Sequence, residues 1–312
     1  MTFEYRDAVR ADVQLLILLA GGTGSGKTES AMRIATGLAG GQPFAVLDTE
    51  NGRALHKADD YTFKHAALDE PFTPERYAEA VKDADDAGFP VIVIDSGSHE
   101  YEGIGGVLDL QREEFARMGS REGARMASWI EPKARHKRFV QQLLRTRAHV
   151  ILNLRAEDKV EIGKDENNRT VVRPKESLIG IDGWIPICEK RLPFEATISL
   201  LLTADAPGVP KPIKLEQRHR ALVPLDRPLD EQVGANLCEW ASGAGAAVAP
   251  ARSQNAGLSM SALKAWIAES GADKDQLAAV AKDLFPDAES FGSLTDGQRA
   301  KVRDRYLELA AV

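Results

Sequence analysis

The chain has 312 residues, of which 43% are hydrophobic and 28% charged, a composition typical of a globular protein with one large and one small domain. Its net charge of −7 argues against an overall basic coat for nucleic acid, but not against a local basic surface. The apolar run at 13–20 is too short to span a bilayer, so no membrane association is expected. Cys188 and Cys238 lie far apart without metal-type spacing, which predicts reduced thiols in a cytoplasmic protein.

Residues 14–28 read QLLILLAGGTGSGKT and contain the G-x-x-x-x-G-K-[ST] pattern of a phosphate-binding loop. Its glycines allow the backbone N–H groups to turn toward phosphate oxygens. We expect Lys27 to reach the β- and γ-phosphates of a nucleotide and the Thr28 hydroxyl to bind Mg²⁺. A helix that begins here would also direct its positive end at the anion. The predicted nucleotide-binding residues are Gly21, Gly22, Thr23, Gly24, Ser25, Gly26, Lys27 and Thr28.

The elements that follow the loop alternate between strands and helices. Apolar runs typical of buried strands occupy residues 13–20, 44–48, 91–94 and 149–154. Apolar residues at helical spacing predict helices at 30–38, 74–87, 113–117 and 131–147. Thr73 and Pro74 suit the cap and first position of the second helix. This alternation predicts an α/β fold with a mostly parallel central sheet, covered by helices on both faces.

The composition of the chain changes after Ala156, where the alternation of apolar strands and helices ends. Residues 156–180 are polar and predict a long loop, with a hairpin around Val171 and Val172. Two strand-like segments, 197–203 and 213–216, are expected to extend the sheet in antiparallel fashion.

Composition also divides the chain into domains. We expect a core over 1–241, a flexible linker rich in Gly, Ala, Ser and Pro over 242–257, and a small all-helical C-terminal domain over 258–312. Helices are expected at 261–269 and 275–284, and a third begins at a capping box of Thr295 and Gln298.

Two carboxylates stand where predicted strands end. Asp95 closes the apolar strand 91–94, and P-loop NTPases carry at such a strand end an acidic residue that holds Mg²⁺. Glu50 follows the strand 44–48 and could orient and polarise an attacking water. Because the carboxyl ends of parallel strands meet at one edge, both are expected on the same side as Lys27. Each could instead be an ordinary turn residue that caps its strand.

The phosphate loop, together with Leu-Asp-Thr-Glu at 47–50, Val-Ile-Val-Ile-Asp-Ser at 91–96 and Val-Ile-Leu-Asn-Leu-Arg at 150–155, resembles the RecA-like ATPases. The resemblance covers about residues 12–225 and is closest to the phage-type branch that acts in DNA recombination and single-strand annealing. It implies ATP and Mg²⁺ as ligands, Glu50 as catalytic base, and Asn153 as the polar sensor. The family often has Asn-Gln at the sensor, whereas this chain has Asn153-Leu154-Arg155, so Asn153 or Arg155 would sense the γ-phosphate.

The same resemblance implies partners. RecA-like proteins bind DNA through two loops that correspond to about 97–128 and 156–180, and they form rings or filaments. Basic residues of a neighbouring subunit complete their ATP site. In this chain the corresponding residues are Lys214, Arg218 or Arg220, although a solvated basic hairpin explains them equally well.

Charge adds an argument for nucleic acid. Between Arg117 and Arg147, nine basic residues face two acidic ones, a local balance of +7. A solvated helix face at a subunit boundary would have the same composition. Trp129 and Trp184 could stack on bases, although core packing is their commoner role.

The sequence therefore predicts a Mg²⁺-dependent ATPase that binds single-stranded DNA and acts in phage recombination, annealing or repair, in the cytoplasm of a bacterial or phage-infected cell. A nucleotide-gated oligomeric scaffold with slow turnover and a P-loop kinase of a small molecule are the alternatives. Residues 258–312 would dock a recombination or replication protein or DNA, or brace a homo-oligomer.

Overall fold

The computed structural model describes residues 10–164, 168–243, 260, 263–264, 266–267, 272–286, 288 and 290–310. The chain divides into two compact units, residues 1–245 and 246–312. Apart from Ser242 and Gly243, the expected linker at 242–257 lies outside the described residues, as does much of the helix expected at 261–269. Among the described residues, no helix has the length and apolar character needed to cross a bilayer.

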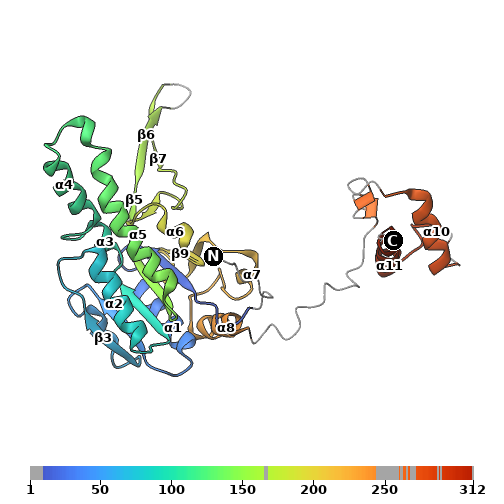
Figure 1. The fold of residues 1–312 in the computed structure, drawn as a ribbon, viewed down its shortest axis with the longest axis horizontal. Coiled ribbons are helices and arrows are strands. Elements are labelled where there is room, and N and C mark those ends of the chain that lie inside the picture. The colour runs from blue at the N-terminus through green and yellow to red at the C-terminus, as the bar shows by residue number, and fades with distance from the viewer. Residues whose placement is uncertain are drawn as a thin grey trace, which may run out of the picture. The chain divides into compact units, whose positions relative to one another are not determined.

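The first unit (Figure 1) is built on an eight-stranded sheet. The strand order is β10-β9-β1-β5-β4-β2-β3, and β8 pairs with the end of β5. Its strands from β1 to β5 and β9 run parallel, while β8 and β10 are antiparallel to their neighbours. The α/β fold with a mostly parallel sheet is confirmed. The strands are β1 (Leu16–Gly21), β2 (Phe44–Asp48), β3 (Phe63–Ala67), β4 (Val91–Asp95), β5 (His149–Asp158), β8 (Trp184–Pro186), β9 (Ile198–Leu202) and β10 (Pro210–Lys214).

Helices cover both faces of this sheet because alternate strand residues point to opposite sides. Ile17 and Leu19 of β1 pack on the side of α1 (Lys27–Ala39) and α8 (Glu231–Ser242). Leu16 and Leu18 pack on the other side, against α2 (Pro74–Asp86) and α5 (Ile130–Arg145). Residues 16–19 are buried throughout, as expected of a central parallel strand, so removal of apolar surface from water fixes the strand that leads into the phosphate loop.

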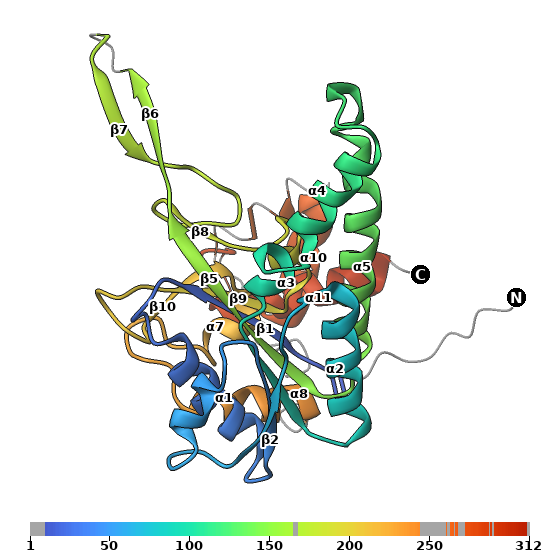
Figure 2. The same cartoon turned by 90° about the vertical axis from the view of Figure 1, so that its left-hand side faces the viewer.

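Two extensions project from the sheet at the end where β5 leaves it (Figure 2). One, the α4–α5 arm, comprises α4 (Val107–Arg117), η2 (Glu122–Ala124), η3 (Ala127–Trp129) and α5. The other is the antiparallel hairpin of β6 (Val160–Lys164) and β7 (Thr170–Pro174). The shorter elements are η1 (Arg53–Lys57), α3 (Ser98–Glu102), α6 (Leu192–Glu195) and α7 (Gln217–Arg220).

The structure corrects several expectations. β3 was missed because it is an edge strand whose side chains are largely solvent-accessible, so it lacks a continuous apolar run. The expected loop at 97–128 contains α3, α4, η2 and η3, and the helix expected at 113–117 begins at Val107. The expected long loop at 156–180 contains a continuation of β5 and the β6–β7 hairpin. The hairpin around Val171 and Val172 and the antiparallel addition of β10 are confirmed, although β10 lies at 210–214 rather than 213–216.

The second unit contains α10 (Lys274–Leu284) and α11 (Asp296–Ala310), with Leu277, Leu294 and Val302 in a small core. The predicted capping box is present: the Gln298 backbone amide donates to Thr295 Oγ1 at 3.3 Å, and the Thr295 backbone amide donates to Gln298 Oε1 at 2.8 Å.

Candidate functional site

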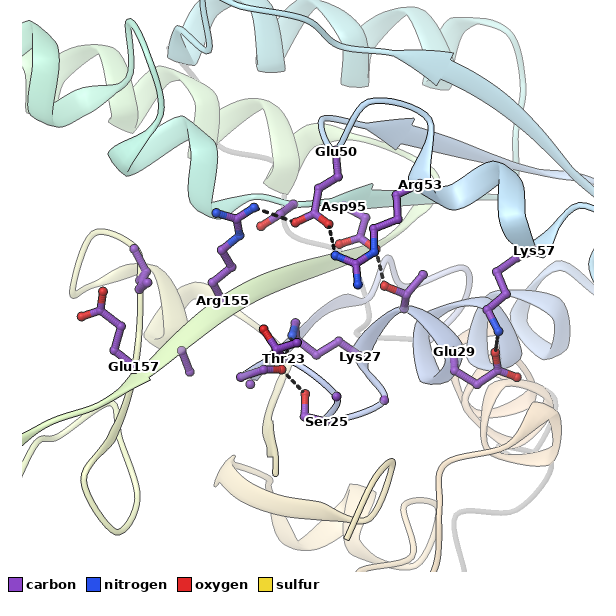
Figure 3. Close-up of a pocket in the computed structure, with 18 of the residues that line it drawn as sticks. Thr23, Ser25, Lys27, Glu29, Glu50, Arg53, Lys57, Asp95, Arg155 and Glu157 are labelled. Carbon is purple, nitrogen blue, oxygen red and sulfur yellow. Dashed lines mark hydrogen bonds and ion pairs between the residues drawn. The ribbon is translucent and has the colours of Figure 1, made fainter. Parts of the chain in front are cut away.

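The phosphate loop joins the end of β1 to the start of α1 and lines a cavity of about 680 Å³ (Figure 3). All eight predicted nucleotide-binding residues line this cavity. Gly26 has φ +83°, and a Cβ there would lie 2.8 Å from the Gly208 amide nitrogen, so the position accepts only glycine. The Lys27 ammonium and the Ser25 hydroxyl each donate to the Gly22 carbonyl at 2.8 Å. These two hydrogen bonds within the loop stabilise its backbone conformation.

The Trp184 ring packs against the phosphate loop at Gly22. A Cβ on Gly22 would lie 2.8 Å from the Trp184 ring, so glycine here permits the indole to rest directly on the backbone. Trp184 belongs to β8, which pairs with the end of β5 where Asp158 faces it. This half-buried tryptophan therefore packs against the loop rather than standing free on the surface.

A magnesium site fits the donor set beside the loop. The Thr28 hydroxyl donates to Asp95 Oδ2 at 2.6 Å, which brings together two oxygen ligands of the kind that Mg²⁺ prefers. Burial raises the pKa of Asp95, and the hydrogen bond from Thr28 opposes that rise. Burial also lowers the pKa of Lys27, against the attraction of Asp95 and Glu50. A bound divalent cation would favour the ionised form of Asp95 and offset its desolvation.

Glu50 reaches the same cavity because Asp48 organises the turn after β2. The buried Asp48 carboxylate accepts hydrogen bonds from the backbone amides of Glu50 at 2.7 Å and Ala54 at 2.9 Å. Glu50 then pairs with two guanidinium groups, through Oε2 to Arg53 at 3.1 Å and through Oε1 to Arg155 at 2.9 Å (Figure 3). Burial alone would raise the pKa of Glu50, but the bonds and charges of Arg155 and Arg53 hold it below its usual value.

The residues predicted as sensors lie at the same edge. Asn153 is fully buried in β5, and neither Nδ2 nor Oδ1 of its side-chain amide has a hydrogen-bond partner among the described residues. Arg155 lies two residues further along β5 and lines the cavity, whereas Asn153 does not line it. Of the two sensor candidates, Arg155 is therefore the one that lines the cavity, where its guanidinium pairs with Glu50.

Comparison with known families matches residues 14–178, just over half of the chain, to the family described as AAA domain. The chain belongs to this family. The matched segment starts in front of β1 and includes the phosphate loop, Glu50, Asp95 and Arg155, so every residue that lines the cavity except Ile187 lies within it. The chain is therefore an AAA-domain P-loop NTPase. Among curated proteins, no relative of the chain was found.

The late basic residues of this AAA-domain protein lie away from the cavity lining. Lys214 donates to the carbonyls of Phe194 and Ala196, each at 2.6 Å, and so braces the turn before β9. Arg218 pairs with Glu216 at 2.9 Å, and Arg220 is exposed at the end of α7. None of the three residues lines the cavity of its own subunit. They could therefore act only at the ATP site of a neighbouring subunit.

The basic segment 117–147 is less positive in the folded AAA-domain protein than its charge count predicts. Several of its arginines pair with carboxylates that lie outside the segment: Arg117 with Glu114, Arg135 with Glu75, and Arg147 with Asp85. The Lys133 ammonium lies 5.6 Å from the centroid of the Trp129 ring, so one face of this ring already makes a cation–π contact.

Arg53 is a site residue that sequence reasoning missed, and it makes an ion pair with the proposed base Glu50. It lies three residues after Glu50 in η1, and this spacing places the two side chains on one face of the turn. The signal was present in the Glu-Asn-Gly-Arg run at 50–53 but is too short to be distinguished from an ordinary polar turn.

Proposed function

We propose that this AAA-domain protein is a Mg²⁺-dependent, RecA-like ATPase that binds single-stranded DNA and acts in phage DNA recombination, annealing or repair. The observation that carries the enzymatic part is the convergence of Lys27, Asp95 and Glu50 on one cavity from the carboxyl ends of β1, β4 and β2, with β5 between β1 and β4. A phosphate anchor, a metal-binding carboxylate and a base are the parts that P-loop hydrolysis requires.

Each side chain has a defined task in this proposal. Lys27 and the amides of the loop hold the phosphates, and the N-terminus of α1 favours their negative charge. Thr28 and Asp95 hold Mg²⁺, which when bound neutralises charge on the phosphate oxygens. Glu50 orients the attacking water and accepts its proton. Arg155 supplies a guanidinium at the cavity wall from within the same subunit.

Single-stranded DNA is proposed on the basis of charge and placement. The α4–α5 arm and the β6–β7 hairpin project from the same end of the sheet that holds the phosphate loop (Figure 2). Basic side chains of the arm outside the ion pairs described above include Arg121 and Lys137. They would contact phosphates in a manner independent of base sequence.

We further propose a homo-oligomer, a ring or filament, in which Lys214, Arg218 or Arg220 approaches the neighbouring nucleotide. The family resemblance and the exposure of Arg218 and Arg220 support this arrangement. The C-terminal unit would recruit a recombination or replication protein, and the protein would act in the cytoplasm of a bacterial or phage-infected cell.

The decisive experiment measures ATP hydrolysis with Mg²⁺, with and without single-stranded DNA, alongside particle size by light scattering. We expect hydrolysis that rises when DNA is added and DNA binding that weakens with salt, with a log–log slope of about −0.7 per neutralised phosphate. ATP binding without hydrolysis would favour the scaffold instead. Hydrolysis that no nucleic acid changes, at low salt and saturating protein, would remove DNA from the proposal and retain the ATPase.

A further inference from the structure

The ion-paired group of Arg53, Glu50 and Arg155 stands between two cavities. All three residues line both the phosphate cavity and a second cavity of about 860 Å³. The second cavity extends from this group to Phe72, His99 and Ile104. Glu50 therefore forms a shared wall, and its orientation decides which cavity its carboxylate serves.

The two arginines hold Glu50 with unequal rigidity. The Arg53 side chain is 68% exposed and extends from the short turn η1, whereas the Arg155 side chain is 44% exposed and extends from β5 in the sheet. The Arg155 backbone is fixed on both sides, since its amide donates to Ser98 Oγ at 2.8 Å and its carbonyl accepts from the Ile187 amide at 2.8 Å. A planar guanidinium on such a base can fix the orientation of a carboxylate.

A general base acts only when one carboxylate oxygen faces the water that it deprotonates. In this structure both Glu50 oxygens already accept a hydrogen bond from an arginine. Arg53 is the partner more readily exchanged for water, because its side chain is the more exposed of the two and extends from a short turn rather than from the sheet. The contact with Arg155 then remains to hold the carboxylate in place.

We propose that Arg155 is the positioning residue for Glu50: its guanidinium holds one carboxylate oxygen and so directs the other toward the phosphate cavity. This inference rests on the proposed role of Glu50 as base. Arg155 would thus act by orienting Glu50, and not by contacting the γ-phosphate itself.

A double-mutant cycle tests the proposal on the full-length chain, with wild type, Arg155→Ala, Glu50→Gln and the double variant compared by single-turnover ATP hydrolysis. Arg155→Ala should lower kcat by about 10- to 100-fold, as expected when a reacting group is misplaced. KM for ATP should change by less than about 3-fold, since the loss acts on the chemical step rather than on binding. In the Glu50→Gln background the same change should alter hydrolysis by less than about 3-fold.

Further variants separate positioning from general damage. Added methylguanidinium should restore part of the activity of Arg155→Ala, whereas sodium chloride at the same ionic strength should not. Arg155→Lys should retain more activity than the alanine variant but less than wild type, because lysine keeps the charge and loses the planar fork. Arg53→Ala should cost less than Arg155→Ala. Arg227→Ala, a surface arginine 3.8 Å from Asp230, is the control with unchanged kcat.

The outcomes distinguish the two proposals. An equal fold loss from Arg155→Ala in both backgrounds would show that Arg155 acts independently of Glu50 and would overturn this inference alone. An increase in KM with kcat unchanged would do the same, in favour of direct nucleotide binding. Unchanged turnover in Glu50→Gln, or ATP binding without hydrolysis by wild type, would overturn the proposed role of Glu50 and this inference with it.

Discussion

Two glycines allow α1, the helix that carries Lys27 and Thr28, to pack closely on α8. A Cβ built on Gly37 would lie 1.9 Å from the Glu231 carbonyl oxygen, and one on Gly234 would lie 2.1 Å from the Ile34 carbonyl oxygen. Real Cβ atoms essentially never approach a neighbour this closely. In Gly37→Ala the two helices must therefore separate by about 1 Å or more, because packed interiors have no free volume to absorb the methyl group.

The cost follows from two opposing effects. Overpacking of this kind costs about 1–3 kcal/mol, while alanine improves the helix by up to about 1 kcal/mol relative to glycine. We expect a net destabilisation of about 1–2 kcal/mol, because the separation also loosens buried contacts such as those of Leu38 and Val233. For a unit of this size that loss lowers the unfolding midpoint by about 2–8 °C.

Thermal unfolding followed by circular dichroism measures this effect, with Gly123→Ala as the matched control. Gly123 lies in η2 with open space where its Cβ would be, so its midpoint should stay within about 1 °C of wild type. A Gly37→Ala midpoint equal to or above wild type would refute the reasoning, since helix propensity would then outweigh the clash.

Other predictions concern the site and a buried ion pair. Lys27→Ala should weaken ATP binding by about 10- to 100-fold in equilibrium titration, because it removes a charged hydrogen bond. Glu50→Gln should leave ATP affinity within about 3-fold and lower kcat by about 10²- to 10⁴-fold; unchanged turnover contradicts it. If Arg218 acts in trans, a mixture of Lys27→Ala and Arg218→Ala chains should hydrolyse ATP faster than either chain alone. The pKa of buried His136 is raised from 6.5, since the bond and charge of Glu100 outweigh the burial that would lower it. The stability gained is full below pH 6.5 and is lost as pH rises through the higher folded pKa, so His136→Gln should be most destabilising, by about 1–3 kcal/mol, below pH 6.5 in denaturant titrations at several pH values.

The sequence alone determined the features whose signal is local. The phosphate loop is recognisable because a glycine pattern of eight residues specifies its backbone, and β2 has the predicted bounds because a buried parallel strand is a continuous apolar run. Asp95 and Glu50 could be placed on one side of the sheet because parallel strands end at a common edge. The exposed edge strand β3 shows the limit of this reasoning, since it lacks such a run.

Only the tertiary structure decided which side chains meet across long stretches of chain. Arg155 reaches Glu50 over 105 residues because β5, β4 and β2 are adjacent in the sheet, and no spacing rule encodes that distance. Trp184 lies on Gly22 for the same kind of reason, through the pairing of β8 with β5. The charge of 117–147 was overestimated because Glu75 and Asp85 lie outside the counted segment and are brought to its arginines only when α2 packs against α5.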